Sequence, residues 1–432
     1  MPTRVGNSKF PGASGSACVW TSKLLKLGPG LITGASDDDP SGIATYSQMG
    51  AQFGYGMLWT MFFSYPLMAA IQEISARIGR VTGHGIAANL RQHYPRWILY
   101  SIVSLVLVAN VINLGADIGA MAAAAKLVLP GPVALYSIGF GVGCTALQVL
   151  VPYTKYVRYL KWLTLALFAY IGTAFVIHIP WHVVIIAVVR PHVSLSKRYF
   201  AGLVAVLGTT ISPYLFLWQA SQEVEDVETT PGEEPLLKAP RQAKKQLKRI
   251  RGDTYVGMAF SNAVAFFIIL TAAVTLHSKG AAEISTAAEA ARALQPVAGR
   301  FASLLFLMGI VGTGLLAVPV LAGSAAYGVS ETFRWRASLE KQPTQAKKFY
   351  AVLIAVTLAG LSLTFVHMAP IKALVWAAVV NGVVAAPLMT VIMLMTTNSK
   401  VMGKFILPSG LKLSGWAATV TMFLAALGLL AT

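Results

Sequence analysis

Charged residues are scarce in this chain. Lys, Arg, Asp and Glu make up 12% of the 432 residues, and hydrophobic residues make up 56%. Soluble domains carry about twice that share of charge, so the composition excludes an ordinary soluble domain. Apolar runs near or above the roughly 20 residues needed to cross a bilayer recur from end to end. The sequence therefore predicts an all-α integral membrane protein.

Cysteine is almost absent as well. Cys18 and Cys144 are the only two, which excludes a disulfide framework and a zinc cluster. No nucleophile with a base partner, HExxH pair or phosphate loop is found either. We therefore expect no enzyme activity and no cofactor. Residues 1–22 lack the apolar core of a signal peptide and are predicted to form a mobile cytoplasmic tail.

Acidic residues are few: 16 Asp and Glu stand against 34 Lys and Arg, giving a net charge of +18. In a soluble protein such an excess would suggest nucleic acid. In a membrane protein Lys and Arg concentrate in cytoplasmic loops. With the N-terminus inside and eleven crossings, most of the basic residues fall on the cytoplasmic side. This predicts a cytoplasmic N-terminus, an external C-terminus, and no nucleic-acid partner.

The chain is expected to form one transporter domain over residues 23–432, made of eleven membrane-spanning helices. Two of these spans are interrupted at similar places. The first reads "SDDDPSG" around Pro40, and the sixth reads "GTTISP" before Tyr214. Paired breaks of this kind indicate two inverted repeats with a binding site at the membrane midplane. We place the first repeat at about 23–190, the second at about 199–396, and an extra helix at about 412–431.

The breaks themselves predict a cation site. Opening a helix frees carbonyl groups at the C-terminus of its first half, where the helix dipole is negative. These carbonyls lie near Ser36 and Thr209, and Asp39 and Ser212 add a carboxylate and a hydroxyl. An ionisable residue inside a membrane is functional by default. Alternatively, Asp39 and Ser212 are N-caps before the prolines that follow them.

Other polar residues in the apolar runs are less decisive. Asp117 is either an ion or proton relay or the partner of a buried basic group, and Asp37 and Asp38 could line the entrance of the site or accept hydrogen bonds from the loop. Asn262 and Asn381 are expected to form inter-helix hydrogen bonds, although Asn262 could also belong to the ion pathway. Two further expectations concern the cytoplasmic side: a salt bridge between Glu73 and Arg77 at a helix end, and a solvated loop from Gln222 to Asp253.

At these two breaks the chain resembles the NRAMP family of divalent-metal transporters. The resemblance implies a leucine-transporter-type fold with broken helices 1 and 6. It also implies a site in which Asp-Pro-Gly-Asn and Met-Pro-His motifs bind manganese or iron, usually with proton coupling. Here Asp39 and Pro40 match, but Gly42 replaces the asparagine, Ser212 the methionine and Tyr214 the histidine. Asp117 also matches, and Ala120 replaces a glutamate three residues later.

These departures resemble the magnesium-transporting branch related to NRAMP. A thioether favours manganese and iron, whereas oxygen donors suit magnesium, which keeps several waters. The sequence thus predicts a plasma-membrane transporter of Mg2+, and also of Mn2+, that works by alternating access. Its partners are the metal ion and the bilayer, and a monomer is plausible. The alternatives are a proton-coupled Mn2+/Fe2+ importer and, less well supported, an amino-acid transporter of the same fold.

Overall fold

The computed structural model describes residues 29–151, 166–191, 193–280, 283–366 and 368–432, and every regular element in these ranges is a helix. The predicted tail, 1–22, and Cys18 lie outside the described residues. The α-helices in chain order are α2 (Pro29–Asp37), α3 (Pro40–Phe53), α4 (Trp59–Thr82), α5 (Ile86–His93), α6 (Arg96–Lys126), α7 (Val133–Leu150), α9 (Phe168–Val176), α10 (Trp181–Val189), α11 (Lys197–Thr210), α12 (Pro213–Thr229), α13 (Ala243–Thr275), α14 (Ala287–Ala291), α15 (Gln295–Ala298), α16 (Ala302–Thr332), α17 (Lys347–Leu363), α18 (Pro370–Thr397), α19 (Ser399–Met402) and α20 (Ser409–Ala431).

Seven helical stretches among the described residues are long and apolar enough to cross a membrane. They contain α6, α7, the α11–α12 pair, α13, α16, α18 and α20. Helices α4 and α17 lie where two further spans were predicted. The all-α membrane class is confirmed, whereas the number of eleven spans stays a prediction.

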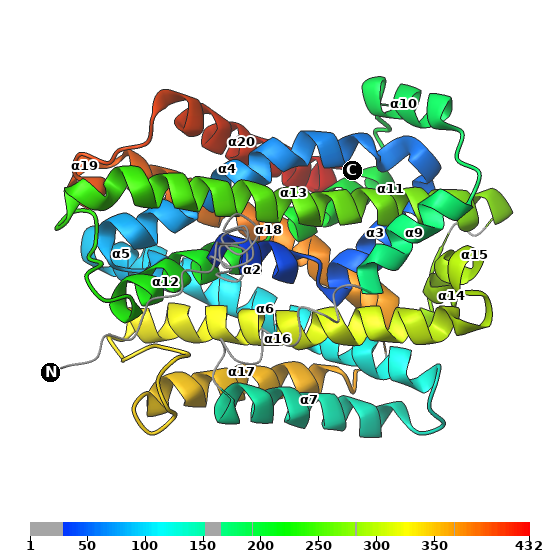
Figure 1. Ribbon diagram of the computed structural model, residues 1–432, viewed down its shortest axis with the longest axis horizontal. Coiled ribbons are helices and arrows are strands. Elements are labelled where there is room, and N and C mark those ends of the chain that lie inside the picture. Colours follow the sequence, from blue (N-terminus) through cyan, green and yellow to red (C-terminus); the bar gives the residue numbers. More distant parts are fainter. Residues whose placement is uncertain (1–28, 152–165, 192, 281–282, 367) are drawn as a thin grey trace, which may run out of the picture.

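The broken first helix lies inside the bundle. Figure 1 shows α2 and α3 (blue) between the long helices α13 and α16, with α7 and α17 forming an outer layer beyond α16. Helix α2 packs closely on α13 because glycines face each other there. A Cβ atom on Gly34 would stand 2.4 Å from the backbone of Gly257. The first half of the broken helix is therefore held against α13 by direct backbone contact.

Both predicted breaks are present. Helix α2 ends at Asp37 and α3 begins at Pro40, while α11 ends at Thr210 and α12 begins at Pro213. Each proline lacks an N–H donor and is favoured in the first turn of a helix, although Pro66, Pro319 and Pro387 are accommodated inside α4, α16 and α18. The chain therefore stops one helix and starts another at each site.

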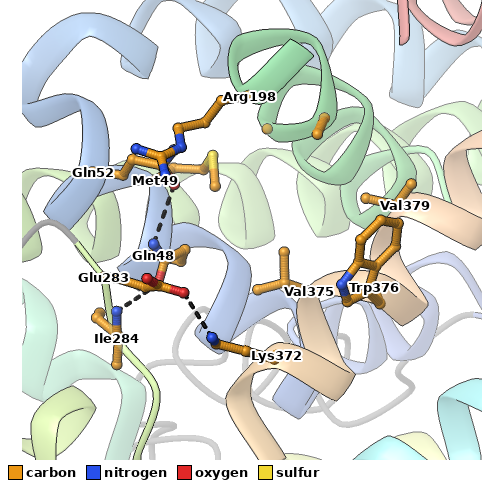
Figure 2. Close-up of a pocket in the computed structure, with 12 residues that line it drawn as sticks. Gln48, Met49, Gln52, Arg198, Glu283, Ile284, Lys372, Val375, Trp376 and Val379 are labelled. Atoms are coloured by element: carbon orange, nitrogen blue, oxygen red, sulfur yellow. Dashed lines mark hydrogen bonds and ion pairs between the residues drawn. The ribbon is translucent and has the colours of Figure 1, made fainter. Parts of the chain in front are cut away.

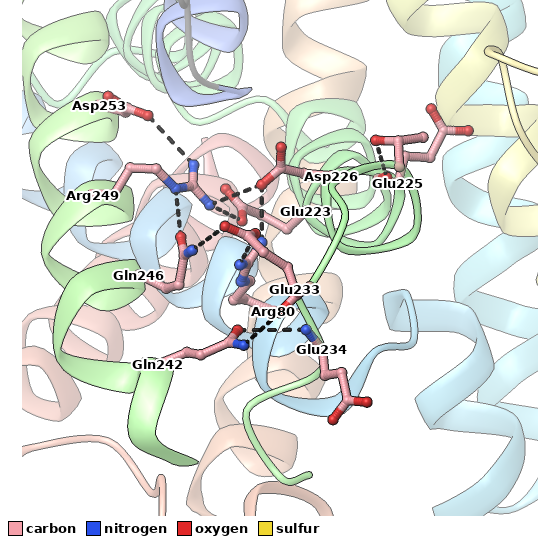
Figure 3. Close-up of polar contacts among 12 residues, drawn as sticks. Arg80, Glu223, Glu225, Asp226, Glu233, Glu234, Gln242, Gln246, Arg249 and Asp253 are labelled. Carbon is pink, nitrogen blue, oxygen red and sulfur yellow. Dashed lines mark hydrogen bonds and ion pairs between the residues drawn. The ribbon is translucent and has the colours of Figure 1, made fainter. Parts of the chain in front are cut away.

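The predicted solvated loop from Gln222 to Asp253 is wrong. Helix α12 continues to Thr229 and α13 already begins at Ala243, and Glu223 is fully buried. Glu223, Asp226 and Glu233 of this segment pair with basic side chains, whereas Glu228 and Glu234 are exposed. Arg249 Nη2 lies 2.5 Å from Glu223 Oε2 and 3.5 Å from Asp226 Oδ2 (Figure 3).

A buried arginine of α4 completes this network. Arg80 has no exposed side-chain surface, and it donates to Asp226 Oδ2 at 2.9 Å and to Glu233. Figure 3 shows how these ion pairs join α4, α12 and α13. Removing one member of a buried ion pair is strongly destabilising, so the network fixes the end of α12. We call this end of the bundle the Arg80 end.

Smaller expectations have mixed outcomes. The Glu73–Arg77 salt bridge is confirmed, with 2.6 Å between Oε1 and Nη2. Asn262 on α13 donates to the Met61 carbonyl of α4 at 2.9 Å, as expected of an inter-helix hydrogen bond. For Asn381 the expectation is wrong, because neither side-chain polar atom has a hydrogen-bond partner among the described residues.

Candidate functional site

Asp39 is the centre of the polar cluster at the two breaks. Its Oδ1 accepts hydrogen bonds from the Gly42 backbone N–H and the Ser41 hydroxyl, both at 2.7 Å. Its Oδ2 accepts from Asn113 Nδ2 at 3.1 Å and from the Tyr214 hydroxyl at 3.2 Å. One oxygen therefore caps α3, while the other faces α6 and α12. The two interpretations of Asp39, as a helix cap and as a site residue, are compatible.

Three further groups meet at the same place. The Tyr214 hydroxyl also lies 3.4 Å from the Ser36 carbonyl, at the open end of α2. A Cβ on Gly42 would stand 3.3 Å from Thr209 Oγ1, so the two breaks approach each other across Gly42. The Tyr46 hydroxyl lies near that of Thr209, and neither makes a hydrogen bond of normal geometry with a described residue. Hydroxyl, carbonyl and carboxylate oxygens thus surround Asp39.

Ser212 takes a different position from the one expected of a free ligand. Its hydroxyl donates to the carbonyls of Thr209, at 2.8 Å, and of Gly208, at 3.1 Å. It is the N-cap of α12, but its side chain makes no capping hydrogen bond to that helix. The hydroxyl and the Thr209 carbonyl that the sequence suggested as separate ligands are therefore already bonded to each other. Each oxygen still has a second lone pair.

Of the remaining residues predicted from the sequence, Asp117 lies near Asp39, whereas Asp38 and Asn262 face other helices. Asp117 is fully buried near Asp39, and neither of its carboxylate oxygens has a hydrogen-bond partner of normal geometry in the described residues. Asp38 turns away from Asp39 and contacts Ser261 of α13. Asn262 faces α4 instead of the breaks. No basic side chain pairs with Asp117 among the described residues, so the relay interpretation is the one left open.

The site is closed toward the Arg80 end. Glu225 of α12 accepts from the Tyr327 hydroxyl of α16 at 2.7 Å and from the Leu339 N–H at 2.9 Å. Glu331 of α16 accepts from the Ser221 hydroxyl of α12 at 3.1 Å. Asp39 itself is only 1% exposed. These contacts join the broken sixth helix to α16, beside a cavity of about 270 Å³ that Ser221, Glu225, Tyr327 and Glu331 help to line.

A cavity of about 360 Å³ lies at the opposite end of the broken α11–α12 helix, between α3, α11 and α18. Its polar lining includes Gln48, Arg198, Glu283 and Lys372 (Figure 2). Glu283 Oε1 lies 2.9 Å from Lys372 Nζ, and this hydrogen-bonded ammonium holds the pKa of the Glu283 carboxyl below its usual value. We call this end the Arg198 end. A cavity therefore lies at each end of the broken α11–α12 helix.

The donors limit the chemistry. In the part of the chain that the structure describes, no three His, Cys, Asp or Glu side chains are arranged to hold a metal ion. An ion at the breaks would meet one carboxylate, together with carbonyl, hydroxyl and water oxygens. Such a set suits hard cations and disfavours soft ones.

Residues 30–432 match the family model described as "Natural resistance-associated macrophage protein-like", Nramp. The chain belongs to the Nramp family. Members of the Nramp family are multi-pass membrane transporters of divalent metal ions and are not enzymes, so the metal is the cargo and not a cofactor.

Solved structures agree with the Nramp assignment. The Eremococcus coleocola manganese transporter, in complex with an aromatic bis-isothiourea substituted compound, is 16% identical over 96% of this chain and 88% of its own, with a TM-score of 0.71. A point mutant of that transporter is 17% identical over 98% of this chain and 89% of its own, with a TM-score of 0.70. Mhp1 is a nucleobase-cation-symport-1 family transporter, solved in a closed conformation with bromovinylhydantoin bound. It is 12% identical over 94% of this chain and 93% of its own, with a TM-score of 0.55. At these identities the likeness shows the leucine-transporter-type fold alone.

Several polar residues at the two breaks were not found by sequence reasoning. Ser41, Tyr46 and Ser261 are polar groups that look like ordinary small or aromatic residues within apolar helices. Asn113 gave a usable signal, because it lies one turn before Asp117 on the same face of α6. Its contact with Asp39 depends on how α6 crosses the first break, which is set by tertiary packing.

Proposed function

We propose that this chain carries Mg2+, and also Mn2+, across the plasma membrane into the cell by alternating access. The observation that supports this most directly is the oxygen-rich surroundings of Asp39, where the Ser41 and Tyr214 hydroxyls contact the carboxylate beside the Asn113 amide. Ser212 stands where the family pattern has a methionine sulfur, and Gly42 stands where it has an amide. Magnesium releases its water reluctantly, and a site without a thioether or a second amide leaves room for bound water.

In this proposal Asp39 neutralises and orients the ion. The Ser36 and Thr209 carbonyls and the Ser212 hydroxyl contribute oxygens directly or through water, with Gly42 and Tyr214 shaping the space. Asp117 serves the pathway or carries a proton. The bundle holding helices 1 and 6 then rocks against the rest of the protein. We assign the Arg80 end to the cytoplasm and the Arg198 end to the outside, in a monomer with the repeat boundaries predicted above.

The test is influx of Mg2+ and Mn2+ into liposomes holding the purified chain and a pH-sensitive dye. The proposal expects Mg2+ influx without acidification of the lumen. Mn2+ influx accompanied by protons, with no Mg2+ influx, would reject the magnesium assignment and favour the proton-coupled Mn2+/Fe2+ importer. Competition by amino acids would instead favour the amino-acid transporter.

Ser212→Met is expected to shift the ratio of Mn2+ to Mg2+ uptake toward Mn2+ by roughly tenfold, or about 1.4 kcal/mol of relative stabilisation. A thioether adds a soft ligand, and loss of the hydroxyl frees the Thr209 carbonyl. Ser212→Ala is the matched control, because it frees that carbonyl without adding sulfur. An unchanged ratio in the methionine variant would mean that position 212 does not face the ion.

Tyr327→Phe is expected to loosen the closure at the Arg80 end. The change removes the hydrogen bond to Glu225 and leaves a buried carboxylate with one donor fewer, at a cost of about 1–3 kcal/mol. A cysteine introduced at Ser221 should then react faster with a membrane-impermeant thiol reagent from the cytoplasmic side. Tyr350→Phe, whose hydroxyl bonds the Lys341 carbonyl at 3.0 Å, is the control. Equal labelling rates in both backgrounds would show that Glu225 and Tyr327 do not hold this side closed.

A further inference from the structure

Asp37 and Asp38 do not share the capping role of Asp39. Helix α2 ends at Asp37, so both carboxylates stand at a helix C-terminus, where the dipole is negative and disfavours an anion. Each of these two residues is only 1% exposed. Their placement therefore costs free energy from desolvation, from the helix dipole and from mutual repulsion.

The protein supplies little compensation for these charges. Ser261 Oγ lies 2.5 Å from Asp37 Oδ2 and 3.1 Å from Asp38 Oδ1, and one hydroxyl proton can serve only one of them at a time. Asp37 Oδ1 has no hydrogen-bond partner among the described residues. Within the same described ranges, no lysine or arginine forms an ion pair with either carboxylate.

A further oxygen lies beside the pair. The Tyr46 side chain is fully buried, and its hydroxyl interacts with the charges of Asp37, Asp38 and Asp39 without a hydrogen bond of normal geometry to any described residue. A phenolic hydroxyl is both a donor and an acceptor. The buried Asp37 Oδ1, which has no hydrogen-bond partner among the described residues, and the lack of an ion-pair partner for either carboxylate there point to a missing cation.

The position of this group is fixed by the helix packing already described. Gly34 precedes Asp37 by three residues and Gly257 precedes Ser261 by four, so each of these pairs shares one helix face, and Asp38 follows directly after the end of α2. The backbone contact between Gly34 and Gly257 then places the two carboxylates on Ser261. Asp37 and Ser261 therefore belong to the crossing of α2 and α13, while Asp38 lies in the break directly after α2.

We propose that Asp37 and Asp38, with the Ser261 and Tyr46 hydroxyls, form a second divalent-cation subsite beside the Asp39 site. The two carboxylates carry the charge that one divalent ion balances, and all the donors are hard oxygens that suit Mg2+ or Mn2+. The pair faces α13, whereas Asp39 faces α6 and α12, so the two ions do not compete for one oxygen set. This inference rests on the proposed function, since it gives the second ion the same chemistry as the cargo.

The experiment measures Mn2+ binding to the purified full chain by equilibrium dialysis, with Mn2+ detected by electron paramagnetic resonance. The wild type is expected to bind a second ion per chain. We expect the ion at the Asp37–Asp38 subsite to be lost, and the ion at Asp39 to be kept, in Asp37→Asn, Asp38→Asn and the double variant. Ser261→Ala should lower the affinity of the subsite for its ion severalfold. Asp39→Asn should lose the ion at the Asp39 site and keep the one at the Asp37–Asp38 subsite. Glu289→Gln, which alters an acid in the α14 capping box, should bind as the wild type does.

Thermal unfolding in a chelator provides a second readout. Without metal, the double asparagine variant is expected to melt at a higher temperature than the wild type, because the repulsion is gone, and to gain less stability from Mn2+. A single ion on the wild type, a second ion retained by the double variant, or equal melting temperatures in chelator would each overturn the subsite. A magnesium assignment that fails in liposomes would leave these Mn2+ stoichiometries unchanged, so the two failures are distinguishable.

Discussion

Asp39→Ala is expected to abolish uptake of divalent cations while leaving the protein folded. The change removes the only carboxylate that the structure places between the two breaks, facing α6 and α12. Losing the N-cap of α3 costs about 0.5–2 kcal/mol, too little to unfold a helix that is buried along most of its length. The measurement is initial Mg2+ and Mn2+ flux into liposomes, normalised to the amount of folded protein.

Asp39→Asn separates the two roles of this residue. The amide oxygen can still accept from the Gly42 N–H and keep the cap, but the negative charge is gone. We expect the asparagine variant to be as inactive as the alanine variant and more stable than it. Normal flux in the asparagine variant would mean that the carboxylate serves α3 and not the ion.

Gly34→Ala is expected to cause a similar loss of transport for a different reason. Alanine normally favours a helix over glycine by about 1 kcal/mol. At position 34 the new methyl group would stand 2.4 Å from the Gly257 backbone, so α2 has to move away from α13. Overpacking of this kind costs about 1–3 kcal/mol, and the shift also separates Asp37 and Asp38 from Ser261. The prediction is a lower melting temperature together with reduced Mg2+ and Mn2+ flux.

Gly143→Ala on α7 is the matched control. A Cβ there meets nothing within 4 Å, so only the gain in helix propensity remains. We expect a melting temperature equal to or above that of the wild type and unchanged flux. If Gly34→Ala behaves in the same way, the contact between α2 and α13 is not as close as described.

The breaks were predictable because their causes are local. Pro40 and Pro213 each stop a helix through the chemistry of their own residue and the one before it, and Asp39 and Ser212 are residues that commonly precede such helices. The apolar runs likewise predicted the membrane class. Asp39 could be found by asking which charge lies inside an apolar run, without knowing its neighbours.

What the sequence could not supply is the direction in which each polar side chain points. Asp37, Asp38 and Asp39 are adjacent in the chain, yet two contact α13 and one faces α6 and α12. Similarly, Asn262 was the residue of α13 considered for the ion pathway besides its expected inter-helix hydrogen bond, whereas its neighbour Ser261 reaches the aspartates. These outcomes depend on the crossing of α2 with α13, which no local pattern specifies.

The segment from Gln222 to Asp253 was misassigned for the same reason. Its many charges are typical of a solvated loop, but the buried guanidinium of Arg80 and the Arg249 side chain provide partners for the acids. A charged stretch can continue two helices when a distant residue supplies the opposite charge.

Asp37, Asp38, Asp39 and Asp117 lie deep in the protein, and in the described ranges no lysine or arginine pairs with them. With these carboxylates ionised, the protein without a bound metal ion has more negative charge at its centre than the protein with one. Moving one charge through the full membrane voltage involves about 2.3 kcal/mol per 100 mV. In the proposed transport cycle, the electrical potential of the cell acts on the return of the empty protein as well as on the ion, and voltage is then a driving force that requires no proton.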